Sequence, residues 1–174
     1  DDLAPMVDLE VEVVASLVPN AVELRGAAAT RDAVIERLTA SATIHLAGHA
    51  MFRPDNPMYS ALRLHDGWLT AADVLDLELP GATVVLSACD TGRTQHRSSA
   101  EVNGFVRGFL GAGASAVVAS QWTADDEATT ALMSAYYSDA GTVRPAEALR
   151  HAQTSVRTRW AHPYFWAPWV VVGR

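Results

Sequence analysis

The only cysteine of the chain, Cys89, ends a short apolar run at residues 84–88. A second run of the same form, residues 43–48, leads into His49. Apolar runs of this length are typical of strands buried on both faces of a parallel sheet. Open α/β sheets present their functional residues at the carboxyl ends of such strands. If the two strands are neighbours, an imidazole and a thiol meet at one edge of the sheet.

A thiol beside an imidazole can carry out nucleophilic catalysis. The thiol is a weak nucleophile until it ionises, and a nearby imidazolium stabilises the thiolate. The corresponding reaction is acyl transfer to Cys89 followed by hydrolysis. The backbone N–H groups of Ala50 and Cys89 are candidate donors to the oxygen of the tetrahedral intermediate.

Both residues also have a structural interpretation, which the sequence leaves open. A lone cysteine often serves as a small buried hydrophobe, and a lone histidine often lies hydrogen-bonded in a core or loop. Their joint placement at two strand ends favours catalysis. Dithiol redox chemistry is excluded because there is no second cysteine. A phosphatase loop is excluded because the position six residues after Cys89 is Gln95.

Metal and cofactor sites are not predicted. His45 and His49 are spaced as metal ligands only on a helix, whereas this segment is predicted to be extended and lacks a third ligand. We therefore predict no metal and no cofactor.

The composition indicates one globular domain over residues 1–174, with 49% hydrophobic and 19% charged residues. A net charge of -7 argues against a direct nucleic-acid partner. No apolar stretch approaches the roughly 18 residues of a membrane span. A lone thiol suits a reducing compartment, which predicts a cytoplasmic protein. The chain begins without Met, so we expect it to be cut from a longer protein.

Hydrophobic periodicity and turn residues predict alternating strands and helices. Strands are expected at residues 9–18, 43–47, 84–89, 116–120 and 170–172, with a short extended piece at Val22 and Leu24 and a hairpin of 61–65 and 67–70 that turns at Asp66-Gly67. Helices are expected at residues 30–38, 70–75, 98–110, 123–137 and 145–160. Capping boxes are expected at Thr70/Asp73, Ser98/Glu101 and Thr123/Asp126, and the polar segment 92–99 is expected to be exposed. This order predicts an α/β fold, a three-layer α/β/α sandwich with a mostly parallel sheet.

Two blocks, residues 45–50 (HLAGHA) and 85–92 (VLSACDTG), resemble CHAT domains. These are caspase-like cysteine peptidase domains that often follow tetratricopeptide repeats. The resemblance continues through residues 111–114, 117–122 and 162–168 and so covers most of the chain from about Thr43. It implies a caspase–hemoglobinase fold and a dyad of His49 and Cys89. Such peptidases often carry glycine after the histidine, where this chain has Ala50, and a left-handed backbone there would be strained.

Residues 122–126 (WTADD) also resemble the separase segment whose last aspartate lines the specificity pocket. This resemblance implies that Asp126 pairs with a substrate Arg or Lys, because a buried carboxylate requires a cation. A helix cap is the alternative role, and both stay open. Asp90 and Gln121, inside the matching blocks, are further candidates for substrate binding.

These features predict a cysteine endopeptidase that cleaves protein or peptide substrates after a basic residue. Its regulation would come from other domains of the parent protein, such as tetratricopeptide repeats. The alternative is a catalytically silent CHAT module that serves as a signalling or interaction platform.

Overall fold

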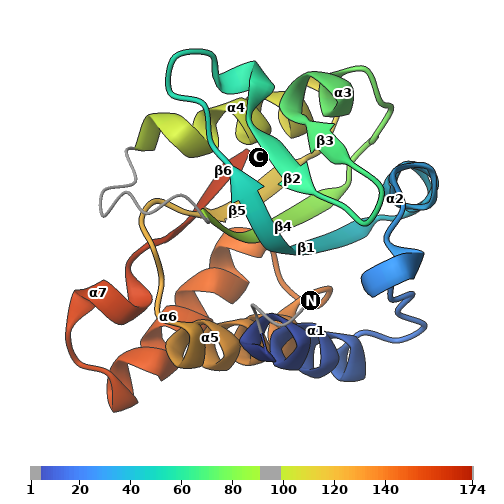
Figure 1. Ribbon diagram of the computed structural model, residues 1–174. Helices are drawn as coiled ribbons and strands as arrows, with labels where there is room; N and C mark the ends of the chain where they lie inside the picture. The colour runs from blue at the N-terminus through green and yellow to red at the C-terminus, as the bar shows by residue number, and fades with distance from the viewer. Residues whose placement is uncertain (1–4, 91–98, 174) are drawn as a thin grey trace. The chain divides into compact units, whose positions relative to one another are not determined.

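The computed structural model describes residues 5–90 and 99–173, without the side chains of residues 5–6, 88–90 and 99–102. The chain forms two compact units, residues 1–23 with 124–171 and residues 24–123 with 172–174. The predicted α/β class is confirmed, because helices flank a six-stranded mixed sheet with the strand order β3-β2-β1-β4-β5-β6 (Figure 1).

The second unit holds the sheet and is called the sheet unit. Its elements are η1 (Gly26–Ala28), α2 (Arg31–Ala40), β1 (Thr43–Met51), η2 (Pro57–Tyr59), β2 (Ala61–Arg63), β3 (Trp68–Thr70), α3 (Ala71–Leu75), β4 (Thr83–Asp90), α4 (Ser99–Gly111) and β5 (Ala116–Ser120). β4 pairs in parallel with both β1 and β5, whereas β2 is antiparallel to β1 and to β3. The centre of the sheet is therefore parallel, as predicted.

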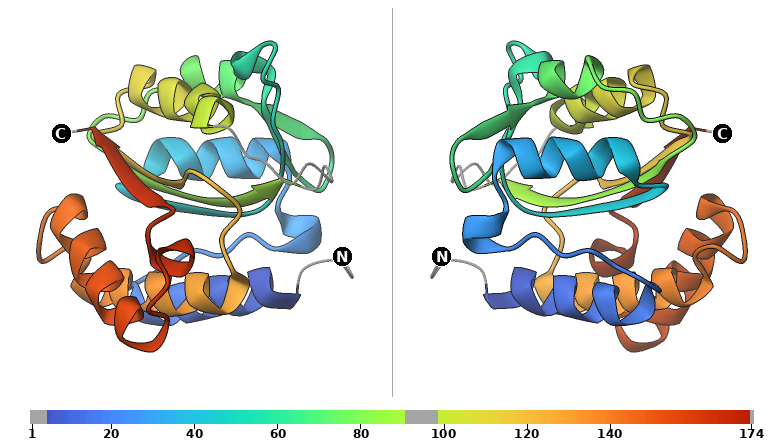
Figure 2. Two further views of the ribbon diagram at one scale, coloured as in Figure 1. Left: turned by 90° about the vertical axis from the view of Figure 1, so that its left-hand side faces the viewer. Right: turned by 90° about the vertical axis from the view of Figure 1, so that its right-hand side faces the viewer.

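One face of the sheet carries the core of this unit. Alternate positions of a strand share one face, and the core takes Ile44 and Ala50 from β1 and Val84 and Leu86 from β4. Helices α2, α3 and α4 supply its other side, and Figure 2 shows α3 and α4 together over the sheet. Aromatic rings link these layers, since Phe105 lies 6.5 Å from Phe52 and 6.2 Å from Phe109 between ring centroids.

Sequence patterns correctly predict most helices and strands of the sheet unit. The Thr70/Asp73 capping box is confirmed, with Asp73 N–H donating to Thr70 Oγ1 at 3.0 Å and Thr70 N–H donating to Asp73 Oδ2 at 2.8 Å. The predicted hairpin is also confirmed, and Leu64 N–H donates to the Gly67 carbonyl at 2.9 Å across its turn. Strand β1 runs four residues beyond its predicted end at Ala47, so His49 lies inside the strand rather than after it.

The first unit is mainly helical and is called the helical unit. It contains α1 (Pro5–Leu17), α5 (Asp126–Asp139), α6 (Pro145–Arg159), α7 (Pro163–Trp166) and the start of β6 (Trp169–Gly173). Helix α5 packs against both α1 and α6 and buries Leu132, Met133 and Tyr136. Pro145 begins α6 as predicted, because its fixed φ suits the first helical turn.

Three predictions about the helical unit are wrong. Residues 9–17 of the predicted strand 9–18 lie in helix α1, because Glu10 and Val14, four apart, share its buried face. Helix α5 begins at Asp126, and its cap is Asp125, whose side chain accepts from Ala128 N–H at 3.0 Å. The Thr123/Asp126 capping box therefore does not form.

Two further predictions concern segments outside the helices and strands named above. Val22 and Leu24 lie in an irregular segment and form no strand. Ser98, the predicted cap of α4, and the polar segment from Gly92 lie outside the described residues.

Candidate active site

His49 and Cys89 occupy opposite positions on neighbouring strands. β1 and β4 run in parallel register from Thr43↔Thr83 to Ala50↔Asp90, and within this register His49 is the Cα partner of Cys89. Adjacent strands lie about 4.8 Å apart. The backbone therefore brings together the two residues that the sequence separates widely, while the side chain of Cys89 lies outside the described part of the structure.

The imidazole of His49 is partly buried. Ile44 and Ala50 point into the core of the sheet unit. Since successive side chains of a strand alternate between faces, the His49 side chain lies on the opposite face of the sheet. Its Nδ1 atom is buried and has no hydrogen-bond partner among the described residues. A buried ring nitrogen normally has such a partner. Nδ1 can therefore form a hydrogen bond with a group from outside the described residues, such as a substrate.

Gly48 sets the backbone immediately before His49. Its φ is +152°, a conformation that side chains rarely adopt. Sequence reasoning missed this residue, although a glycine inside an apolar strand is the signal for unusual backbone geometry.

Ala50 follows His49 and is paired with a strand on each side. It is completely buried, and it pairs with Leu62 of β2 on one side and with Asp90 of β4 on the other. Among the described non-glycine residues only Asn20 has a positive φ, so Ala50 does not have the strained left-handed backbone considered from the sequence.

The three candidate substrate-binding residues are distributed over both units. Gln121 is exposed directly after β5, and Asp90 ends β4 with its side chain outside the described residues. Asp126 opens helix α5 in the helical unit. Its side chain is exposed, yet its remaining desolvation, followed by the charges of Asp125 and Glu10, raises the pKa of the Asp126 carboxyl above its ordinary value. A cation near Asp126 would relieve this repulsion.

Comparison with known proteins identifies the family. The family model described as the CHAT domain matches residues 3–174. The chain belongs to the CHAT domain family. CHAT domains are caspase-like, so the family resemblance inferred from the sequence motifs is confirmed, as is the corresponding fold class.

A human relative shows where such a region can occur. Tetratricopeptide repeat protein 28 of Homo sapiens is 27% identical to this CHAT domain over 191 aligned residues. The match covers 86% of this chain but only 8% of the relative. The CHAT domain thus corresponds to a small part of a much longer protein that is named for its repeats.

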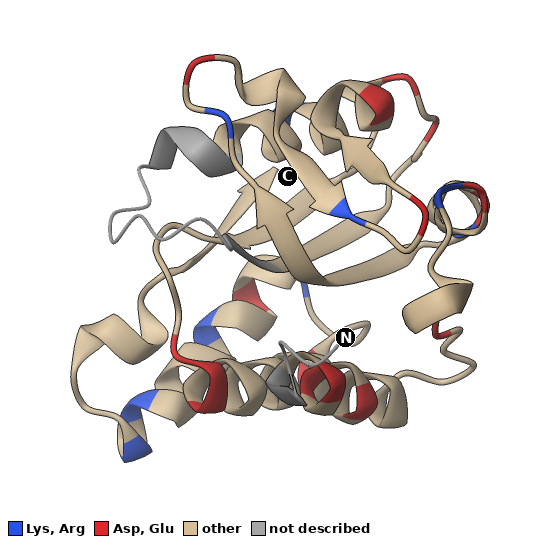
Figure 3. Cartoon of the chain, viewed as in Figure 1, with Lys and Arg blue, Asp and Glu red and all other residues tan. Residues whose placement is uncertain are grey.

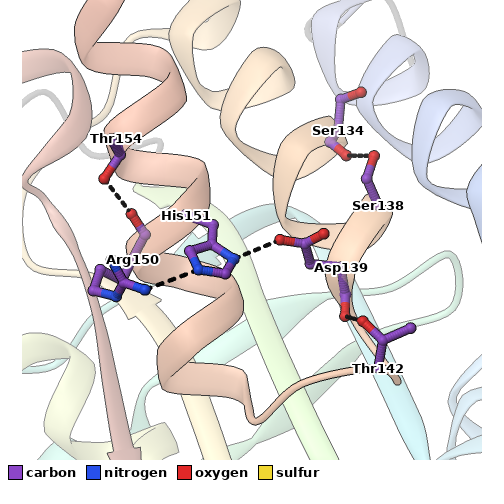
Figure 4. A network of polar contacts seen from close by, with 7 residues as sticks. All are labelled: Ser134, Ser138, Asp139, Thr142, Arg150, His151 and Thr154. Atoms are coloured by element: carbon purple, nitrogen blue, oxygen red, sulfur yellow. Dashed lines mark hydrogen bonds and ion pairs between the residues drawn. The ribbon is translucent and has the colours of Figure 1, made fainter.

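A second polar cluster of the CHAT domain lies between α5 and α6 (Figure 4). His151 Nδ1 lies 2.7 Å from Asp139 Oδ2, and Arg150 Nη2 lies 2.8 Å from His151 Nε2. Since arginine can only donate, Nε2 accepts and Nδ1 carries the proton that Asp139 accepts. Three of the hydroxyls drawn in Figure 4, those of Ser138, Thr142 and Thr154, donate to backbone carbonyls. In the described part of the chain these three hydroxyls bond to carbonyls rather than to His151, which instead links α6 to Asp139 at the end of α5.

Among the described residues of the CHAT domain, no three His, Cys, Asp or Glu side chains are grouped so that they could hold a metal ion. None of the described helices is both long and apolar enough to cross a membrane.

Proposed function

We propose that this CHAT domain is a cysteine endopeptidase in which Cys89 is the nucleophile and His49 its general base. The observation that carries the proposal is the parallel register of β1 and β4, in which His49 and Cys89 are Cα partners. A backbone pair at the spacing of adjacent strands, about 4.8 Å, is close enough for the proton transfer that nucleophilic catalysis needs. The buried Nδ1 of His49, which lacks a described partner, supports the same assignment.

The proposed reaction has two halves. His49 accepts the thiol proton of Cys89, and the thiolate attacks the carbonyl carbon of the scissile peptide bond. The C–N bond then breaks as the imidazolium protonates the leaving amine, which leaves a thioester. His49 next deprotonates a water that attacks the thioester carbon, and the C–S bond breaks to release the acid and restore the thiol. The N–H groups of Ala50 and Cys89 are the proposed donors to the oxyanion in both halves.

The proposed specificity is for a basic residue before the cleaved bond. Desolvation, followed by the negative charges of Asp125 and Glu10, raises the pKa of the Asp126 carboxyl. A substrate guanidinium or ammonium would offset that repulsion. Asp90 and Gln121 are proposed to contact the substrate backbone on either side.

A peptide-library cleavage assay tests the activity, and the Cys89→Ala variant is the control for contaminating proteases. The expected result is cleavage after Arg or Lys that Cys89→Ala abolishes. Cleavage that survives in Cys89→Ala would disprove the assignment of the nucleophile. Cleavage after basic residues that is unchanged in Asp126→Ala would disprove the role of Asp126 alone.

A catalytically silent interaction module is the second candidate. It is favoured by the burial of Ala50, whose backbone pairs with a strand on each side instead of facing solvent. Iodoacetamide labelling separates the candidates, because a thiolate activated by His49 reacts much faster than an ordinary thiol. Rapid labelling of Cys89 that is lost in His49→Ala supports the peptidase. Equally slow labelling of both proteins supports the silent module.

We further propose that the parent protein regulates this domain. The relative's name refers to tetratricopeptide repeats, and repeats of that kind are the proposed regulatory partner. The single cysteine, which needs a reducing environment to stay a free thiol, supports a cytoplasmic site of action.

A further inference from the structure

The helical unit carries a partly exposed group of aromatic and arginine side chains at the end of α6 and in α7. We call this group the aromatic ledge and define it by Arg157, Arg159, Trp160, Tyr164, Phe165 and Trp166. The rings contact one another, with centroids 6.5 Å apart for Trp160 and Phe165 and 5.4 Å apart for Tyr164 and Phe165. Tyr164 is 43% exposed, and the other three rings are partly exposed.

The ledge is held in a fixed conformation. The side-chain amide of Gln153 donates to the carbonyls of Trp166 at 3.1 Å and Trp169 at 2.9 Å, which fastens the end of α7 and the start of β6 to α6. The guanidinium carbons of Arg157 and Arg159 lie 5.9 Å and 4.3 Å from the ring centroids of Trp166 and Trp160. Rigid aromatic and arginine side chains are the residues that contribute most to protein interfaces.

The two arginines differ in their ionic partners. Arg159 pairs with Glu127 at 2.5 Å. Arg157 is exposed and stacks on Trp166, but it has no carboxylate partner among the described residues. Its N–H groups are therefore available to a carboxylate from outside the chain. A matching surface would combine carboxylates with apolar side chains.

Helix α1 presents such a surface. Its exposed face, called the α1 face, consists of Asp8, Leu9 and Glu12, and Leu9 is 43% exposed. Asp8 and Glu12 are one helical turn apart, and the helix contains no basic residue. Figure 3 shows acidic residues on α1 and basic residues at the end of α6. The two surfaces are complementary in charge and both expose apolar side chains.

One chain cannot bring its own two surfaces together. Within the helical unit α5 packs against both α1 and α6, and Figure 1 shows α1 on one side of α5 and α6 with α7 on the other. We propose that the α1 face of one copy binds the aromatic ledge of a second copy. Because the two surfaces differ, the contact is heterologous and repeats from copy to copy, giving a ring or an open chain.

Charge reversal tests the proposal on the 174-residue chain. Sedimentation velocity should show association that increases with concentration and weakens with added salt, since exposed charges are screened. Arg157→Glu and Glu12→Arg should each weaken association about tenfold or more. Arg144→Glu, at the exposed start of α6, and Glu78→Arg, in the sheet unit, are the matched controls and should associate normally.

Mixing the two variants gives the decisive measurement. Arg157→Glu keeps a native α1 face and Glu12→Arg keeps a native ledge, so an equimolar mixture should associate again through these two native surfaces. Far-UV circular dichroism checks that each variant is folded. A chain that stays monomeric at all concentrations would overturn the proposal. So would association that both reversals leave intact, or a mixture that remains monomeric.

Discussion

His49 and Cys89 are Cα partners in the parallel register of β1 and β4. Their alignment depends on register, because a slip of one residue would place the two positions on opposite faces of the sheet. The burial of Ile44 and Ala50 on β1 and of Val84 and Leu86 on β4 fixes that register through the core. The candidate dyad is therefore held by packing on the other face of the same strands.

Gly48→Ala should disturb the candidate site directly. A β-carbon at Gly48 would meet no atom within 4 Å, but the φ of +152° would be strained by a side chain. We expect a loss of stability of about 1–3 kcal/mol, measured by urea unfolding, together with slower alkylation of Cys89. Gly67→Ala is the control, because that glycine also has open space but no such φ. Equal stability of the two variants would contradict the prediction.

The sequence identified β1, β4 and the Thr70/Asp73 cap because local residues determine them. It could not distinguish a strand from a helix at residues 9–14, where the alternation of apolar and acidic residues also fits a helix that buries Glu10 and Val14. Nor could it supply the register of β1 against β4, which results from contacts between distant segments. The role of Gly48 depends on a backbone angle that composition does not reveal.

Gly104→Ala should loosen the attachment of α4. A β-carbon at Gly104 would overlap the backbone carbonyl of Pro57 in η2, which cannot yield as a flexible side chain could. We expect a loss of about 1–3 kcal/mol in urea unfolding. Asn103→Ala, at the exposed neighbouring position, should leave stability within about 0.5 kcal/mol of the wild type. The prediction is wrong if both variants unfold at the same urea concentration.

Asp73 should make stability depend on pH. Burial alone would raise the pKa of its carboxyl, but hydrogen bonds from Thr70 and the charge and hydrogen bond of Arg31 together lower that pKa below its ordinary value. A carboxylate with a lowered pKa stabilises the fold above the unfolded pKa near 4, and this stabilisation is lost as the pH falls through the folded pKa.

The measurement compares Asp73→Asn with the wild type by urea unfolding at pH 7 and pH 3. The variant should be about 1 kcal/mol less stable at pH 7, and the difference should shrink at pH 3. Asp76→Asn, at an exposed carboxyl near the end of α3, should change little at either pH. A difference of the same size at both pH values would show that charge has no part in the effect.

Substitutions of Asp125 and Asp126 should distinguish helix capping from substrate recognition. The Asp125 side chain accepts from Ala128 N–H at 3.0 Å, so Asp125→Ala should lower stability by about 1 kcal/mol. Asp126 makes no such cap, and a substrate cation would offset its desolvation and its repulsion by Asp125 and Glu10. Asp126→Ala should therefore keep most of the stability while the preference for Arg and Lys substrates is lost. Urea unfolding and peptide cleavage on both variants measure the two effects, and a loss of basic preference in Asp125→Ala but not in Asp126→Ala would reverse the assignment.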